Sequence, residues 1–169
     1  MKMRWLIGAA VLGSVAVAIP VPVIAAGTAS AATTPTTPTA FSGGFTSEPT
    51  GASYRLADGN IFITVTDSVT FTGGTFDGTS IEQINMVLHP DLSIEFHGSD
   101  VCGCTVAGSF VGTIVMRFSG NGVWNGPTIG YISIGHGTGP LANLHGTATF
   151  LSLNGGTYGT WSGVYHFAP

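Results

Sequence analysis

The chain has 169 residues, of which only 7% are charged, and its formal net charge is −4 with histidine neutral. Two of its four lysine and arginine side chains lie within the first four residues, so no basic cluster exists further along. Nucleic acids and anionic membrane surfaces are both bound through clustered bases. The composition therefore excludes both as partners of the folded part.

Residues 1–31 have the three-part pattern of a secretory signal peptide. Lys2 and Arg4 precede a long apolar run, and Ala29-Ser30-Ala31 is a small-x-small cleavage site. The alternative is an uncleaved membrane anchor, because the run from Trp5 to Ala26 is long enough to cross a bilayer. We expect cleavage after this site and secretion to the extracellular side, with no further membrane contact.

Residues 32–40 form a Thr- and Pro-rich segment without apolar periodicity. Such a segment cannot bury enough surface to order itself, so we expect an extended tether. The remaining residues, 41–169, suffice for one domain with a hydrophobic core. Once the signal peptide is removed, the chain keeps two basic residues, Arg55 and Arg117, and eight acidic residues, which gives a net charge of −6 with histidine neutral.

Beyond the tether, short β-branched and aromatic runs alternate with Gly, Asn, Asp and Pro, a pattern typical of strands. His89-Pro90-Asp91 and Asn154-Gly155 predict turns. No stretch after residue 41 has a capped helical period. The expected strands are 54–56, 61–71, 79–89, 92–97, 108–119, 122–125, 128–134, 147–151 and 157–167. About eight antiparallel strands predict an all-β domain, either a closed barrel or a sandwich.

Two features favour a small antiparallel barrel. Glycine recurs inside the strand runs, for example at Gly130 and Gly159, where it is typical of tight bends and barrel corners. The runs 81–88 and 110–116 are apolar on both faces, and such strands need cover on both sides. We therefore expect a filled interior and an apolar outer patch that favours a homo-oligomer.

The segment 135–146 is rich in glycine and contains Pro140, so it turns between two strands. Leu141 and Leu144 are apolar residues within this turn. We expect these two leucines to plug one end of the β structure.

Two segments, 108–120 and 135–150, resemble a bacterial family of domains of unknown function that is grouped with the allene oxide cyclase barrel-like fold. The family typically has a Gly-Ser-Gly-Thr-Gly-x-Leu-x-Gly-Leu-x-Gly turn after a strand, and the likeness covers roughly Asp67 to Phe167. Here Asn143 stands where the family usually has glycine, and Phe118 stands where many members carry a polar residue. The resemblance implies an eight-stranded barrel, allene oxide cyclase-like or calycin-like, with an internal pocket and no settled activity.

Cys102 and Cys104 are the only cysteines. In an exported chain this even count favours oxidation, and three outcomes stay open: a disulfide between the two, a bridge to a second chain, or free thiols. A metal site built from this pair with His97 and Asp100 matches no standard zinc spacing, so we expect no metal and no cofactor.

Few polar side chains stand out as candidates for chemistry. Glu95 and His97 share one face of a strand and could form an acid–base pair, but the alternating apolar residues around them favour a solvated face. Arg117, Tyr131 and Tyr158 are the candidate ligand-binding residues, because an arginine can orient an anionic ligand and tyrosines supply rings and hydroxyls. Strand parity places Arg117 on the outer face, and the competing arrangement turns it inward.

No catalytic template such as Gly-x-Ser-x-Gly, a phosphate loop or His-Glu-x-x-His occurs, so catalytic residues stay unassigned and enzyme activity stays open. Three functions remain. The first is a secreted barrel that binds a small, mostly apolar molecule in its interior. The second is a cyclase or isomerase that acts by shape on a reactive apolar substrate. The third is a structural or adhesive cell-surface protein, favoured by the tether and the apolar outer patch.

Overall fold

The computed structural model describes residues 34–135 and 137–169. The expected signal peptide and its cleavage site lie outside the described residues, as do the first two residues of the expected tether. Within the described ranges, no helix has the length and apolar character needed to cross a membrane.

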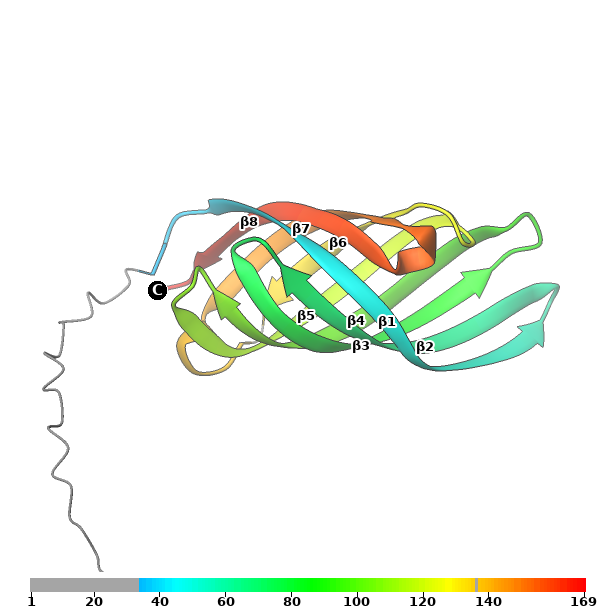
Figure 1. Cartoon of the computed structure of the whole chain (residues 1–169), viewed down its shortest axis with the longest axis horizontal. Helices are drawn as coiled ribbons and strands as arrows, with labels where there is room; N and C mark the ends of the chain where they lie inside the picture. Colours follow the sequence, from blue (N-terminus) through cyan, green and yellow to red (C-terminus); the bar gives the residue numbers. More distant parts are fainter. Residues whose placement is uncertain (1–33, 136) are drawn as a thin grey trace, which may run out of the picture. The chain divides into compact units, whose positions relative to one another are not determined.

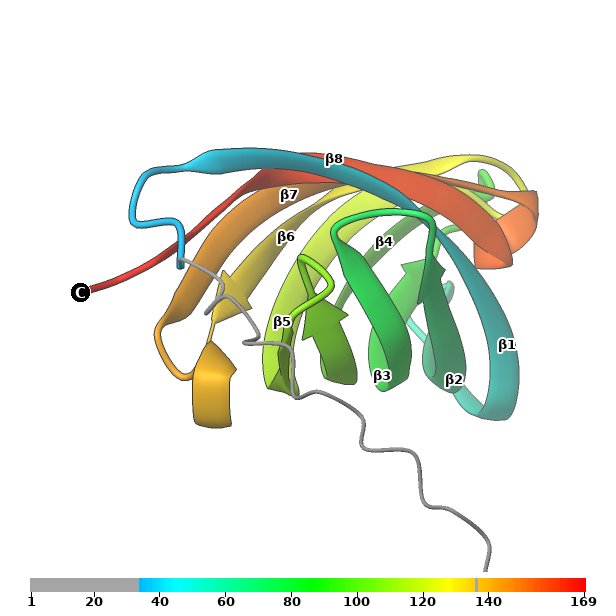
Figure 2. The same cartoon turned by 60° about the vertical axis from the view of Figure 1, so that its left-hand side comes forward.

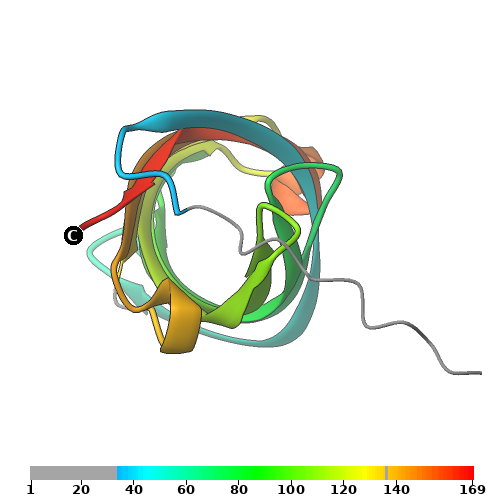
Figure 3. The ribbon, with the colours of Figure 1, turned by 90° about the vertical axis from the view of Figure 1, so that its left-hand side faces the viewer.

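Eight antiparallel strands follow one another around a closed barrel (Figure 1). The strands are β1 (Thr39–Ala57), β2 (Asn60–Thr72), β3 (Phe76–Leu88), β4 (Ser93–Val106), β5 (Phe110–Val123), β6 (Thr128–Gly135), β7 (Leu144–Leu153) and β8 (Tyr158–Phe167). Each strand pairs with the next, and β1 also pairs with β8, so the strands form a ring when viewed along the barrel (Figure 3). The expected all-β fold of about eight antiparallel strands is confirmed.

Strand β1 is long because it changes partner along its length. Residues 39–46 pair with β8, and residues 44–57 pair with β2, with a register shift between Pro49 and Gly51. Figure 2 shows the first part of β1 lying beside β8. The second part forms with β2 a hairpin that extends past the closed part of the barrel (Figure 1).

This strand differs most from expectation. Only residues 54–56 of it were predicted, and 39–40 were assigned to the tether. In the structure Thr39 and Ala40 pair with Tyr165 and Val164 of β8, and the backbone N–H of Phe167 donates to the carbonyl of Pro35 over 2.8 Å. The domain therefore begins before residue 41, because pairing with the last strand orders a segment that is too polar to order itself.

The inward face of the barrel is filled by aromatic rings that lie over glycines. In five cross-strand pairs, a ring occupies the space into which a Cβ of the opposite glycine would project. The pairs are Phe96 with Gly120, Phe118 with Gly98, Phe150 with Gly130, Phe45 with Gly159, and Trp161 with Gly43. Glycine within these strands therefore makes room for large rings in a narrow interior, as in the aromatic cover of glycines in other sheets.

One end of the barrel is closed by the connection between β6 and β7. This connection contains the 3-10 helix η1 (Gly139–Leu141), in which Pro140 lies in the first turn, where no backbone donor is needed. Leu141 and Leu144 are both fully buried, so the prediction that they plug one end is confirmed. They pack in the larger of two core clusters, together with Phe76, Ile114 and others.

The second core cluster contains Leu88, Ile94, Phe96 and Phe118. Ile132 and Phe150 pack against both clusters and connect them. The connection between β7 and β8, at the end opposite the leucine plug, contains the 3-10 helix η2 (Asn154–Gly156). Asn154 and Gly155 both have positive φ angles, in agreement with the turn expected from this dipeptide.

Apolar side chains also lie on the outer face. Ile81 of β3 is 55% exposed and pairs with Val101 of β4, which is 49% exposed. The apolar outer positions expected of strands that are apolar on both faces are therefore confirmed, while self-association through them stays a prediction.

Candidate functional site

A cavity of about 100 Å³ lies inside the barrel and touches both core clusters. Its lining is mostly apolar and aromatic. The lining side chains include Phe45, Phe71, Met86, Ile94, Phe96, Met116, Phe118, Ile132, Phe150 and Trp161. The cavity reaches Gly155 and Gly156 in the β7–β8 connection, so it faces the end of the barrel that the leucine plug does not close. Among these apolar groups lie two carboxyl groups, those of Glu82 and Asp100.

Three acidic residues lie side by side on adjacent strands. Asp67 of β2 pairs with Glu82 of β3, and Glu82 pairs with Asp100 of β4. Side chains that are directly opposite on one face of antiparallel strands have Cβ atoms about 5 Å apart. The register therefore brings three carboxyl groups into one row on the inward face, and Glu82 is the middle one.

The carboxyl groups in this row are poorly supplied with hydrogen-bond donors. Asp67 is 7% exposed, and its Oδ2 accepts a hydrogen bond from the hydroxyl of Ser47 over 2.7 Å, while its Oδ1 has no partner. Asp100 is only 4% exposed, and its Oδ1 has no partner either. Buried polar atoms are normally satisfied, so each such atom needs an explanation.

Burial changes the protonation of these groups. Burial, together with the negative charges of Asp100 and Asp67, raises the pKa of Glu82 to about 8, and burial is the largest of these causes. Burial also raises the pKa of Asp100 to about 6, with the nearby hydroxyl of Ser80 opposing the change. The pKa of Asp67 is raised by burial as well, and the hydrogen bond from Ser47 opposes that rise. Near neutral pH, Glu82 is thus mostly protonated and Asp100 mostly charged.

This combination can do two things chemically. A carboxylate with a free oxygen in an apolar cavity can accept a hydrogen bond from a ligand. A protonated carboxyl group beside it, with a pKa close to neutral, can act as a general acid toward a molecule in the same cavity. Both actions need a partner that enters the barrel.

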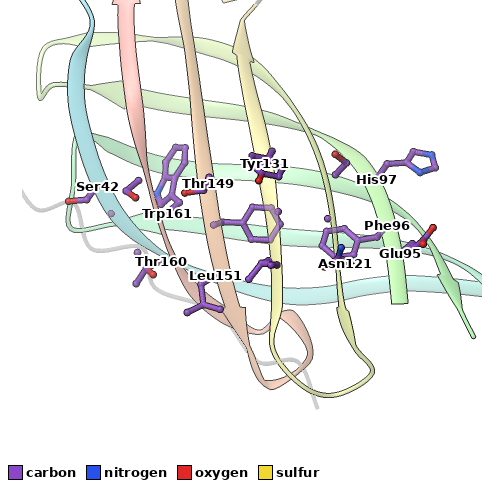
Figure 4. Close-up of a pocket in the computed structure, with 18 of the residues that line it drawn as sticks. Ser42, Glu95, Phe96, His97, Asn121, Tyr131, Thr149, Leu151, Thr160 and Trp161 are labelled. Atoms are coloured by element: carbon purple, nitrogen blue, oxygen red, sulfur yellow. The ribbon is translucent and has the colours of Figure 1, made fainter. Parts of the chain in front are cut away.

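A larger and more open hollow of about 1170 Å³ lies between two cross-strand rows of outward side chains (Figure 4). Strands β1 and β3 to β8 all contribute to it. One row consists of Ser42, Ser162, Thr149, Tyr131, Ser119 and His97, and the other includes Thr160, Leu151, Ile129, Asn121 and Glu95. These side chains are exposed, so the hollow is an open groove on the outer face.

The structure places Arg117, Tyr131 and Tyr158 on the outer face. Arg117 is exposed, and Tyr131 and Tyr158 are 72% and 44% exposed. Arg117 and Tyr131 line one shallow outer depression, which does not include Tyr158. The outward position that strand parity predicted for Arg117 is confirmed. These three residues do not line the interior cavity, and ligand binding by them stays a prediction.

Of the other predicted groups, Glu95 and His97 lie on the outer face of the barrel, and the two cysteines lie on the inner face. Glu95 and His97 are exposed, which agrees with the solvated face that alternation favoured. Cys102 and Cys104 point inward, with 5.4 Å between their Cα atoms, and the structure joins them as a disulfide. Since His97 lies on the opposite face from this pair, the four residues considered for zinc do not converge. In the described part of the chain, no group of three His, Cys, Asp or Glu side chains is arranged to hold a metal ion.

The inward carboxyl groups of Glu82 and Asp67 were not among the sequence candidates, and Asp100 was considered only for a metal. A signal for two of them does exist in the sequence. Glu82 has the same parity as Ile84, Met86 and Leu88, and Asp100 has the same parity as Ile94 and Phe96. An acid at an apolar position of an alternating strand is a mark of a buried carboxyl group.

Comparisons with known proteins identify a fold but no activity. The barrel is similar to a solved structure from Shewanella oneidensis MR-1, described as a protein with unknown function from the DUF3224 family. The TM-score is 0.62 and the sequence identity 17%, and the alignment covers 79% of this chain and 100% of that chain. At this identity the likeness shows the fold alone. No family model matches the sequence, and no curated protein matches it significantly.

Proposed function

We propose that this protein binds a small, mostly apolar molecule inside its barrel, after export to the outside of the cytoplasmic membrane. The observation that carries the proposal is the interior cavity of about 100 Å³, in which aromatic and methionine side chains surround two carboxyl groups. Ligand sites are typically apolar hollows with a few well-placed polar groups, and an eight-stranded barrel can hold one small ligand.

The size of the cavity limits the ligand. An apolar cavity of about 150 Å³ engineered into another protein binds benzene, whereas pockets for drug-sized molecules measure about 300 Å³ or more. A cavity of about 100 Å³ therefore suits a molecule of a few heavy atoms. A longer ligand would have to extend past Gly155 and Gly156, where the cavity reaches the β7–β8 connection.

Sequence features outside the cavity also support export and the binding of an apolar molecule. The pattern of residues 1–31 is typical of an exported chain, and the low charge of the remaining chain suits a carrier of apolar molecules. The segment 135–150 resembles allene oxide cyclase-like barrels, and we propose that the interior serves as the binding compartment, as the resemblance implies.

A second candidate function is a shape-directed isomerase or cyclase. It is favoured by Glu82, because burial raises its pKa to about 8 and so keeps a proton donor inside an apolar cavity at neutral pH. Turnover that disappears in Glu82→Gln, with ligand binding retained, would support it. The third candidate, an adhesive surface protein, draws on exposed apolar side chains such as Tyr54 and Leu56, which are 78% and 74% exposed.

Native mass spectrometry of protein purified from culture medium tests the proposal. We expect a chain that begins at or near Ala32 and carries bound mass, or takes up small apolar molecules that are added. Ser152→Leu places a larger side chain in the cavity lining, because Ser152 is 2% exposed and lines the cavity, and it should abolish uptake. Thr149→Leu is the matched control on the outer face of the same strand, because Thr149 is exposed. Equal uptake by both variants, or none by the unaltered protein, would overturn interior binding.

A further inference from the structure

We infer that the interior cavity selects a small organic cation, namely a protonated amine with an apolar body, and that Asp100 is its anionic partner. This inference rests on the proposed interior binding and adds the chemical class of the ligand. It follows from the charge balance of the cavity, from one unpartnered oxygen and from the aromatic lining.

The charge balance of the interior is negative. Asp67, Glu82 and Asp100 lie in one inward row on three adjacent strands. The side chains that line the cavity include two of these carboxyl groups and no lysine, arginine or histidine. The two arginines of the described residues, Arg55 and Arg117, are exposed on the outer face. A buried carboxylate without a cation is costly, so a ligand that brings positive charge is favoured over a neutral or anionic one.

Asp100 provides the point of attachment. Its side chain lines the cavity and is 96% buried, since only 4% of its surface is exposed. Its Oδ1 has no hydrogen-bond partner, and the hydroxyl of Ser80, which lies close enough to oppose the rise in the Asp100 pKa, has none either. An ammonium group has donors and no acceptor, so it can donate to the Asp100 carboxylate and also to the neighbouring carboxyl group of Glu82. Hydrogen bonds between charged partners are about twice as strong as those between neutral ones.

The rest of the lining favours an organic cation over a metal ion. Hard metal ions such as Ca²⁺ need about six or more oxygen ligands, whereas here two carboxyl groups are surrounded by Phe96, Phe118, Phe150 and Trp161. Ring faces attract organic ammonium groups, and rings together with Met86 give an alkyl body the apolar contacts that a metal ion would not use. The site thus combines an anionic end with an apolar volume.

The test uses two probes of nearly equal shape, isobutylammonium chloride and isobutanol, with sodium and calcium chloride as salt controls. Binding to the exported chain is measured at pH 7 by calorimetry and by the shift in melting temperature. We expect isobutylammonium to bind about tenfold or more tightly than isobutanol, a difference of about 1.4 kcal/mol. Asp100→Asn should remove that preference, while Glu95→Gln, which changes an exposed acid on the same strand, should keep it.

The outcomes distinguish the selection of a cation from interior binding itself. If isobutanol binds as tightly as the amine, or if Asp100→Asn keeps the preference, the selection of a cation is wrong and interior binding stands. If the salts produce the same shift as the amine, the site takes a metal ion and the inference is also wrong. If neither probe binds and no ligand is retained, the proposed function itself fails. Should Asp100→Asn not fold, the comparison of the two probes on the unaltered protein decides the question alone.

Discussion

The ring of Phe150 on β7 lies over Gly130, the residue directly opposite on β6, and its Cε1 is 2.5 Å from the place where a Cβ of Gly130 would be. The same arrangement recurs at four further pairs around the interior. Each glycine lets the ring of the opposite residue lie against the backbone of the glycine's own strand. A narrow barrel can therefore hold several aromatic rings in its interior, because the residue opposite each ring has no side chain. Glycine content and aromatic packing are therefore two aspects of one arrangement.

This arrangement predicts that Gly130→Ala is destabilising although alanine is small. The added methyl group would meet the Phe150 ring and the backbone carbonyl of Ser119, and neither can move far in a packed interior. We expect a loss of about 1 to 3 kcal/mol in the free energy of unfolding, measured by urea titration. Gly51→Ala is the control, because no atom lies within 4 Å of the corresponding Cβ position, and it should change stability by less than about 0.5 kcal/mol. Equal effects of the two changes would contradict the packing argument.

Leu144 should be among the most costly side chains to truncate. It is fully buried at the closed end of the barrel, so Leu144→Ala removes apolar contacts and leaves a cavity. We expect a loss of about 2 to 4 kcal/mol in the free energy of unfolding. Glu95→Gln, on an exposed face, should change it by well under about 1 kcal/mol. Denaturant midpoints in the reverse order would show that the leucine does not close the barrel.

Much of the fold could be predicted from the sequence, because alternation and turn residues are local signals. The turns at His89-Pro90-Asp91 and Asn154-Gly155, the closed barrel and the burial of Leu141 all followed from such signals. Strand β1 did not, because residues 39–53 have little apolar content and are ordered by pairing with β8 and β2. Runs 108–119 and 122–125 were expected to be separate strands, but residues 110–123 form the single strand β5, since its small inward glycines do not interrupt the pairing.

The candidate site was harder to predict than the fold. Parity could have shown that Glu82 and Asp100 point inward, but their alignment depends on the register between three strands. That register is set by the connections at residues 73–75 and 89–92, including the positive φ angle of Leu92. Arg117 was a sequence candidate because arginine is scarce in this chain. The scarcity of a residue type does not indicate which face of a strand its side chain occupies.

The buried carboxyl groups predict how stability depends on pH. The pKa of Glu82 in the folded chain is about 8 and that of Asp100 about 6, both above the values of 4.5 and 3.8 for the free side chains. Between these limits the folded state binds more protons than the unfolded state, so stability must fall as pH rises. We expect urea midpoints to decrease from about pH 4 to about pH 8, contrary to the behaviour of salt-bridged acids.

Glu82→Gln isolates the main source of this dependence. Glutamine is neutral at every pH, so the decrease above about pH 6 should largely disappear in this variant, whereas Glu95→Gln should keep it. A midpoint that rises with pH in the unaltered protein would mean that the three carboxyl groups have cationic partners, and a midpoint that stays constant would mean that they are open to water. Either result would also remove the electrostatic basis for binding an amine.

The last prediction concerns Arg117, which points outward from β5 between Ser99 on β4 and Ser133 on β6. Because both opposite residues are uncharged, the guanidinium group has no directly opposed carboxylate on the neighbouring strands. Arg117→Met should therefore change the free energy of unfolding by less than about 0.5 kcal/mol, and it should leave the uptake of small molecules unchanged. Chemical denaturation and native mass spectrometry measure the two quantities on the same sample. If this substitution abolishes the retention of a ligand while the chain stays folded, the ligand lies in the outer depression beside Tyr131 and not in the interior. Asp100→Asn would then have no effect on binding, so the two variants together assign the ligand to one face of the barrel.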